Sequence, residues 1–175
     1  MRFAHVTVPG TAEPRLVVVR DDEARPVSGL FDGAPGTLQR LVEGGDARLG
    51  RVREAAERPG TWHPLAGAVF GPAVATPPVV LAVGLNYAAH SSELGLKADT
   101  APTVFVLWPN SLTGHEGTTS WPRTLSQAVD YEAELGVVIG TPARDVSPDD
   151  ALAHVWGYTV VNDITARDIQ FSEAQ

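Results

Sequence analysis

The residues that decide the fold are 129–140, VDYEAELGVVIG, a run whose second half is apolar and typical of a β-strand. Glu132 and Glu134 are two residues apart in this run. On a strand, residues i and i+2 face the same side, so these two residues lie about 7 Å apart at their Cα atoms. Two carboxylates this close favour a cation between them, and oxygen ligands suit Mg²⁺, Mn²⁺ or Ca²⁺. Two solvated glutamates on the outer face of a strand are the alternative.

A third acidic residue ends the next predicted strand. Residues 154–163, HVWGYTVVND, are rich in β-branched and aromatic side chains and finish at Asp163. Residues 164–170 have the pattern of the first turns of a helix. Asp163 therefore lies at a predicted strand-to-helix junction, where it either caps the helix or adds a third carboxylate to the pair on the preceding strand.

A histidine and a glutamate follow an upstream strand. Residues 78–85 are an apolar run of strand length, and 86–94 read as a loop that enters a short helix closed by Gly95. His90 and Glu93 are three residues apart, a spacing that places both on one helix face. Such a pair can act as a general-base dyad, although an ordinary surface contact has the same spacing.

Three blocks of the sequence, 83–93, 130–140 and 157–170, together resemble the fumarylacetoacetate hydrolase family. The similar subgroup contains acylpyruvases, oxaloacetate decarboxylases, 2-hydroxyhepta-2,4-diene-1,7-dioate isomerases and related hydratases. The resemblance implies an α+β, β-rich fold, in which a mixed β-roll over 79–175 carries a small N-terminal α/β appendage over 1–60. A linker is expected over 61–78.

The resemblance also implies roles for individual residues. It implies that a divalent cation, Mg²⁺ or Mn²⁺ with Ca²⁺ as a further candidate, is held by three carboxylates: Glu132, Glu134 and Asp163. It implies a catalytic dyad on a lid, formed by His90 and Glu93. The residues expected to contact substrate are Tyr87, Trp108, Arg167 and Gln170.

The activity that the resemblance implies is a divalent-metal-dependent hydrolase or lyase that cleaves a C–C bond of a 2-oxo acid or its enol. The substrate is expected to be similar to an acylpyruvate or to oxaloacetate. A metal that holds the carboxylate and the 2-oxygen of such a substrate stabilises the developing enolate. Isomerase, hydratase or cyclase activity on the same enolate is one alternative. A non-catalytic or split family member that serves as a partner subunit is another.

Two features depart from the family pattern. Many relatives carry a lysine at the position of Trp108; an indole cannot offset a substrate's negative charge, but it can stack on a flat acyl tail or pack in a core or interface. Family chains also continue beyond the block that ends at Gln170, so the main domain is expected to be C-terminally incomplete. The remaining strands would then belong to a longer product or a complementing chain, unless the activity is lost. Homodimerisation is expected from the resemblance, and exposed sheet edges favour pairing with a partner.

Local patterns predict the N-terminal unit. Strands are expected at 2–8 and 15–19, and helices at 37–43 and 47–57, the second weakened by Gly50. The 17 glycines and 14 prolines that separate short apolar runs favour a β-rich architecture.

Composition limits the partners. With 175 residues, of which 43% are hydrophobic, the chain has room for one main domain with a small appendage. A net charge of −8 without a basic cluster argues against nucleic-acid binding. The absence of cysteine excludes disulfides and a thiol nucleophile. No apolar run approaches the roughly 20 residues of a membrane span, so the expected compartment is the cytoplasm.

Overall fold

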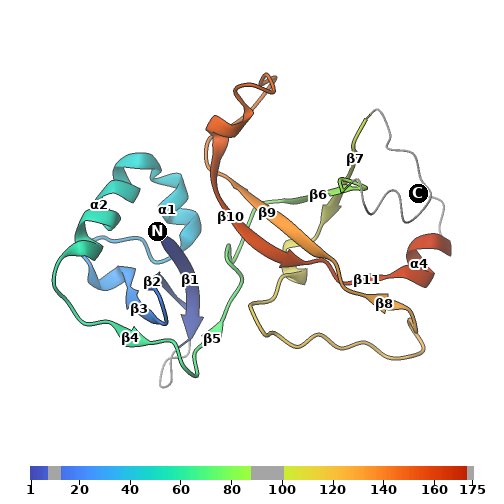
Figure 1. Ribbon diagram of the computed structural model, residues 1–175, viewed down its shortest axis with the longest axis horizontal. Helices are drawn as coiled ribbons and strands as arrows, with labels where there is room; N and C mark the ends of the chain where they lie inside the picture. Colours follow the sequence, from blue (N-terminus) through green and yellow to red (C-terminus); the bar gives the residue numbers. More distant parts are fainter. Residues whose placement is uncertain (8–12, 88–100, 173–175) are drawn as a thin grey trace.

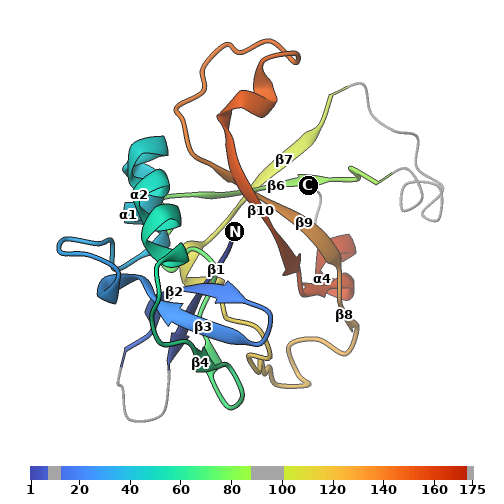
Figure 2. The same cartoon turned by 60° about the vertical axis from the view of Figure 1, so that its left-hand side comes forward.

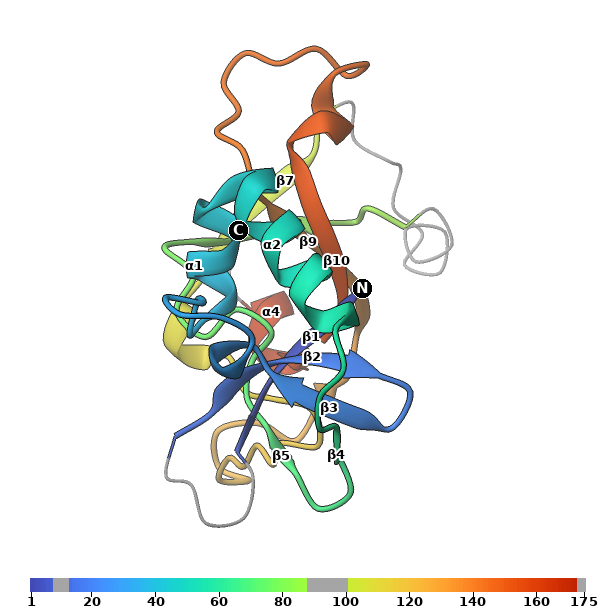
Figure 3. The same ribbon diagram turned by 90° about the vertical axis from the view of Figure 1, so that its left-hand side faces the viewer.

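The computed structural model describes residues 1–7, 13–87 and 101–172, which form two units lying side by side (Figure 1). The N-terminal unit is built on a five-stranded sheet with the strand order β4-β3-β2-β1-β5. Its strands are β1 (Arg2–Thr7), β2 (Arg15–Arg20), β3 (Glu23–Pro26), β4 (His63–Pro64) and β5 (Val69–Phe70). A short 3₁₀ turn, η1 (Val27–Gly29), and two helices, α1 (Leu38–Glu43) and α2 (Gly45–Glu57), complete the unit, and Figure 3 shows the helices together on one side of the sheet.

The N-terminal core forms because β2 is apolar on both faces. Leu16 and Val18 pack on the helix side, where Leu41 and Val52 are fully buried. Val17 faces the other way, into a smaller buried cluster on the opposite face of the sheet. A strand covered on both faces reads as a continuous apolar run, which explains why the sequence 16–19 does not alternate.

A buried histidine ties three segments of this unit together. The Nε2 atom of His5 accepts a hydrogen bond from the backbone N–H of Leu38, at the first residue of α1, at 3.2 Å. Its Nδ1 atom lies 3.2 Å from the carbonyl oxygens of Pro72 and of Ala73. Since Nε2 must be unprotonated to accept, the ring is neutral with its proton on Nδ1, which donates to this pair of carbonyls. Thr37 caps the same helix, because its Oγ1 accepts from the N–H of Arg40 at 3.2 Å.

The predicted linker over 61–78 contributes two short strands to the N-terminal sheet. β4 pairs with β3, and β5 pairs with β1. Each strand has only two residues, and the N–H of Leu65 adds a bond to the carbonyl of Asp22 at 2.8 Å. Edge strands this short are held by backbone hydrogen bonds and carry no apolar periodicity, so the sequence held no signal for them. The division into domains stays a prediction.

The described residues of the C-terminal unit form three antiparallel strand pairs. The strands are β6 (Val80–Gly84) with β7 (Thr103–Leu107), β9 (Ala133–Ile139) with β10 (Val155–Asn162), and β8 (Val129–Asp130) with β11 (Thr165–Ala166). The 3₁₀ turns η2 (Pro109–Ser111) and η3 (Ala151–His154) and the helix α4 (Arg167–Ser172) complete it. Figure 2 shows the β9–β10 hairpin with its long connection extending beyond both units. The predicted α+β, β-rich class is confirmed, and every strand pairing in the described ranges is antiparallel.

The two units meet at Trp156. The register between β10 and β9 shifts between Val155 and Gly157, so Trp156 is the extra residue of a β-bulge. The indole leaves the strand pairing and packs on the N-terminal core, where its ring centroid lies 5.8 Å from that of Phe3. Gly140 makes this possible, since a Cβ there would lie 2.7 Å from the Cβ of Trp156.

A loop of the C-terminal unit makes a second contact. The ring of His115 meets that of Phe70 edge-on, with centroids 5.6 Å apart. Gly114 lies against the backbone of the same phenylalanine, so closely that a side chain there would clash with its carbonyl group. The loop that contains Gly114 and His115 therefore packs closely against β5. Among the described residues, no helix is long and apolar enough to cross a membrane.

Candidate functional site

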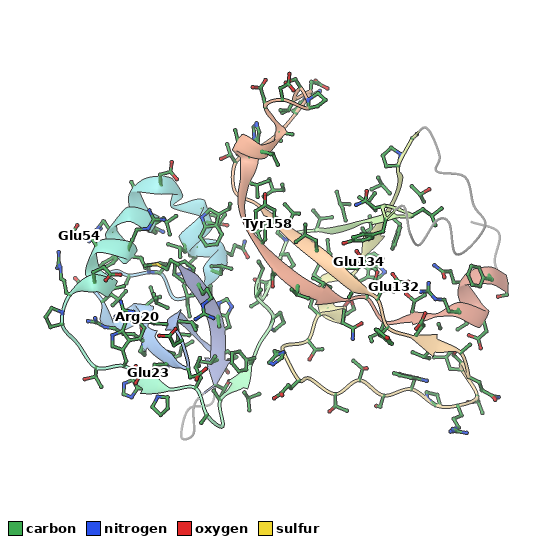
Figure 4. The ribbon with its side chains drawn as sticks, viewed as in Figure 1. Arg20, Glu23, Glu54, Glu132, Glu134 and Tyr158 are labelled. Atoms are coloured by element: carbon green, nitrogen blue, oxygen red, sulfur yellow. The ribbon has the colours of Figure 1, made fainter. Side chains whose placement is uncertain are left out.

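The predicted strand over 129–140 is interrupted, and the interruption lies at the first candidate ligand. β8 ends at Asp130 and pairs with β11, whereas β9 begins at Ala133 and pairs with β10. The chain bends between them because the two halves have different partners. The alternation of faces persists: Glu132 and Glu134 both lie on the partly buried side, while Tyr131 is exposed. Figure 4 shows the two glutamates near each other, at the end of the hairpin that leads to β8 and α4.

Asp163 joins these glutamates through the strand register. Val161 lies opposite Glu134, and two residues later the N–H of Asp163 donates to the carbonyl of Glu132 at 3.0 Å. Directly opposite residues have Cβ atoms about 4.5–5.5 Å apart, and diagonal neighbours about 7–8 Å. The register therefore places all three carboxylates on one face of the hairpin.

The prediction that a helix begins directly after Asp163 is wrong. Thr165 and Ala166 pair with Asp130 and Val129 as β11, and α4 begins only at Arg167. Asp163 is therefore separated from the helix and does not cap it. Short strand pairing has overridden a helical pattern, because the β8 backbone supplies hydrogen-bond partners that the local sequence does not reveal.

The electrostatics of Asp163 are those of a crowded acidic face. Partial burial raises the pKa of Asp163, the negative charge of Glu132 raises it further, and the positive charge of Arg167 acts in the opposite direction. A carboxylate in this environment is stabilised by additional positive charge. The face is thus suited to a cation.

Arg167 is the cation that contacts Glu132 and Asp130 in the described part of the chain. Its Nη1 atom lies 2.6 Å from Oε1 of Glu132 and donates to Oε1 of Gln170 at 3.0 Å. Its Nε and Nη2 atoms both donate to Oδ2 of Asp130, at 3.1 Å. Arg167 and Gln170 were predicted to contact substrate; they contact each other beside the acidic face, and the substrate role stays a prediction.

The three carboxylates are of the chemical type that binds a hard divalent cation, although their oxygens do not converge on one position. Within the described ranges, no three carboxylate, imidazole or thiol groups lie close enough together to hold a metal ion. One oxygen of Glu132 faces Arg167 instead. Three carboxylates on adjacent strands nevertheless supply the oxygen ligands and negative charge that Mg²⁺ and Mn²⁺ require. The metal ligands therefore stay predictions that the strand register supports.

The remaining predicted site residues have different outcomes. His90 and Glu93 lie outside the described residues. The hydroxyl of Tyr87 accepts a hydrogen bond from the N–H of Leu135 at 3.2 Å, next to the acidic face. Trp108 is exposed, and its carbonyl accepts from the hydroxyl of Ser111 at 2.8 Å. Contact of Tyr87 and Trp108 with substrate stays a prediction.

Several polar residues that support the site were not singled out from the sequence. The Oδ1 atom of Asn162 accepts from the N–H of Glu132 at 3.1 Å. The buried hydroxyl of Ser126 donates to Oδ1 of Asp168 at 2.6 Å, which fastens the loop before β8 to α4. These pairs are 30 and 42 residues apart along the chain. Their positions inside or beside the three family blocks were the only signal available.

The C-terminal part of the chain matches a known protein family. Residues 79–175 match the model of the fumarylacetoacetate (FAA) hydrolase C-terminal domain, which is more than half of the chain. The chain belongs to the fumarylacetoacetate hydrolase family. All three predicted metal ligands lie in the matched region, as do β6 to β11.

Relatives of this family member have several activities. Over 147 residues the chain is 35% identical to the oxaloacetate tautomerase YisK of Bacillus subtilis, an alignment that covers 78% of this chain and 49% of the relative. The chain thus spans about half the length of this curated relative. Hydrolases, isomerases, decarboxylases and tautomerases all occur in the family.

Solved structures of the family share the fold. A Mycobacterium smegmatis protein of the HpcE type superposes with a TM-score of 0.80 at 30% identity, over 99% of this chain and 58% of that chain. Maleylpyruvate hydrolase from Sphingobium sp. SYK-6, solved with manganese(II) and pyruvate, superposes with a TM-score of 0.76 at 26% identity. That match covers 95% of this chain and 60% of the hydrolase.

Proposed function

We propose that this chain carries the metal-binding part of an enzyme that acts on a 2-oxo acid or its enol. The observation that carries the proposal is the register of β9 and β10, which brings Glu132, Glu134 and Asp163 to one face. Membership of the family supports it, and so do the manganese ion and pyruvate in the structure of the Sphingobium relative. We assign the three carboxylates as ligands of Mg²⁺ or Mn²⁺.

The chemistry requires charge stabilisation and a proton carrier. A bound Mg²⁺ or Mn²⁺ would supply Lewis-acid stabilisation of negative charge that develops on the substrate's 2-oxygen. The three carboxylates supply the negative charge that holds such a cation. Arg167 holds one oxygen of Glu132 in place at 2.6 Å. We assign the proton transfer to His90 and Glu93. A general base must lie within hydrogen-bond reach of the group that it deprotonates, so this role requires both residues to approach the substrate.

We propose C–C bond cleavage, by hydrolysis or decarboxylation, as the reaction. A second candidate is tautomerisation or isomerisation of the same substrate class, which the name of the Bacillus subtilis relative favours. Both reactions pass through negative charge on the same oxygen. Product analysis with acylpyruvates and oxaloacetate distinguishes them, because cleavage yields two products and tautomerisation yields none that are smaller than the substrate.

A third candidate is a role as a partner subunit, either in a homodimer or with a complementing chain. The observation that favours it is the exposure of large apolar side chains along the C-terminal strands, such as Leu81, Val106 and Leu135. Exposed apolar strands of this kind are suited to cover by another polypeptide. A subunit that acts only in this way would not bind a divalent cation through its own carboxylates.

The test is heat denaturation of the full chain over a Mn²⁺ titration, compared with Glu134→Gln. The matched control is Glu54→Gln on α2, because Glu54 is exposed and pairs only with Arg58 in the described part of the chain (Figure 4). We expect saturable stabilisation of the parent and of the control, reaching about 2.7 kcal/mol at a hundred times Kd. We expect the Mn²⁺ affinity of Glu134→Gln to fall at least tenfold, because even partners outside the ligand set typically change metal affinity by this much.

The outcomes separate the candidates. Metal stabilisation that is lost in Glu134→Gln and kept in Glu54→Gln supports the enzyme and leads to the substrate assays. A folded parent without saturable Mn²⁺ binding contradicts it and favours the partner-subunit role.

A further inference from the structure

Asp130 is not among the assigned metal ligands, and its contacts indicate a separate role. Its Oδ1 atom accepts a hydrogen bond from the N–H of Tyr131 at 2.9 Å, which fixes the carboxylate. Its Oδ2 atom accepts from both Nε and Nη2 of Arg167, each at 3.1 Å. A planar guanidinium that donates through two of its nitrogens to one carboxylate oxygen is fixed in orientation as well as in position.

The orientation directs the third nitrogen at a predicted ligand. The Nη1 atom of Arg167 lies 2.6 Å from Oε1 of Glu132, and Gln170 accepts from the same nitrogen at 3.0 Å. The side chain of Arg167 is only 18% exposed, so this ion pair is screened by solvent and salt far less than a surface pair.

Backbone hydrogen bonds hold the segments that carry Asp130 and Arg167 next to each other. Asp130 pairs with Thr165 across β8 and β11. The N–H of Arg167 donates to the carbonyl of Ala128 at 2.8 Å. Strand pairing therefore brings the carboxylate and the guanidinium close together independently of the contact between their side chains.

We propose that Asp130 is a positioning residue that acts through Arg167 on Glu132, an inference that rests on the proposed function. With Oε1 of Glu132 held by Arg167, Oε2 is the oxygen of this side chain that would bind a divalent cation. Asp130 also neutralises the guanidinium, whose positive charge would otherwise repel that cation. Both effects raise the affinity of the site for metal. Partners outside the ligand set typically change metal affinity by about 10- to 100-fold.

The test is the Mn²⁺ dissociation constant, measured from the electron paramagnetic resonance signal of free Mn²⁺, for the full-length parent and five variants. Asp130→Asn keeps the size of the side chain and removes its charge, and we expect Kd to rise about tenfold. Asp130→Glu keeps the charge, and we expect it to retain most of the affinity. The matched control is Asp145→Asn, because Asp145 is exposed and pairs with Arg144 at 3.6 Å on the hairpin connection. We expect the control to change Kd by less than about twofold, since distant exposed charges are screened.

The path through Arg167 is tested by a double-mutant cycle. If Asp130 acts through the guanidinium, Asp130→Asn adds no further loss of affinity in the Arg167→Gln background. Thermal unfolding of each variant without metal confirms that it folds. If Asp130→Asn does not fold, Asp130→Ser takes its place in the cycle.

The results distinguish the two proposals. Absence of saturable Mn²⁺ binding in the parent contradicts the proposed function itself. Binding in the parent with equal Kd values for Asp130→Asn and Asp145→Asn overturns the positioning role alone. An undiminished effect of Asp130→Asn in the Arg167→Gln background overturns it as well.

Discussion

The two units of the chain differ in where their apolar side chains lie. In the N-terminal unit, Leu41 and Val52 are fully buried between the sheet and the helices. Every fully buried apolar residue among those described lies between Val6 and Ala56. On the β9–β10 hairpin, by contrast, alternate apolar side chains face outward, and Val160 is 83% exposed. The buried apolar core is therefore concentrated in the N-terminal unit, whereas the candidate site lies in the C-terminal unit.

The site unit depends on register and polar contacts instead of a packed core. Polar contacts link α4 to β8 and to the loop before it, among them Asp130 with Arg167 and Ser126 with Asp168. Such contacts define geometry well, but each contributes only about 0.5–3 kcal/mol. A unit held in this way is expected to respond strongly to changes that affect its connection to the N-terminal core.

The largest expected effect is on the stability of the N-terminal core. Leu41→Ala should lower the free energy of unfolding by about 2–5 kcal/mol, because it leaves a cavity at a fully buried position. Val160→Ala is the counterpart on the hairpin, and it should change stability by less than about 0.5 kcal/mol. Urea unfolding followed by circular dichroism measures both. Comparable losses at the two positions would show that the hairpin face is packed in solution.

The next prediction concerns the junction of the two units. Trp156→Ala should cost about 2–4 kcal/mol, since it removes the indole that packs against Phe3 and the N-terminal core. Because few other contacts join the units, their unfolding should separate into two transitions. Trp108→Ala is the matched control, since Trp108 is 74% exposed. Urea unfolding monitored by both circular dichroism and fluorescence checks this; a single coincident transition in Trp156→Ala would contradict it.

The smallest effect is a pH dependence in the site unit. The hydroxyl of Ser126 is the main cause that lowers the pKa of Asp168, assisted by backbone N–H groups. Because this carboxyl has a lower pKa in the folded state than the unfolded value of about 3.9, its ionisation stabilises the fold at pH values above 3.9. This stabilisation is lost as the pH falls through the folded pKa. The stability difference between the parent and Asp168→Asn should therefore shrink between pH 6 and pH 3. Urea midpoints at these pH values test it, with Asp145→Asn as control; a constant difference would refute the lowered pKa of Asp168 in the folded state.

Much of the local structure follows from short-range patterns. The helix predicted at 37–43 is observed as α1 at 38–43, with Thr37 as its cap, and the helix predicted at 47–57 is observed as α2 at 45–57. The apolar strands at 80–84 and 155–162 also lie within or close to their predicted ranges. These elements are predictable because capping residues, apolar spacing and β-branched runs act within a few residues.

Other features could not be predicted in this way. The bend at 131–132 exists because β8 and β9 pair with different strands. The late start of α4 has the same cause, since β11 must first pair with β8. The bulge at Trp156 directs the indole onto a core whose residues lie a hundred or more positions earlier in the sequence. Each of these features depends on a partner that is distant along the chain.

Three features can be read from the amino acids alone: the residue types of the candidate site, the spacing of Glu132 and Glu134, and the resemblance that led to the family. The folded chain was needed to learn that Asp163 lies opposite Glu132 and that Asp130 holds Arg167 against the same glutamate. The physical reason is the range of the interactions. Side-chain alternation along a strand is local, whereas strand register and ion-pair geometry arise only when segments distant along the chain pair through their backbones, as β11 does with β8.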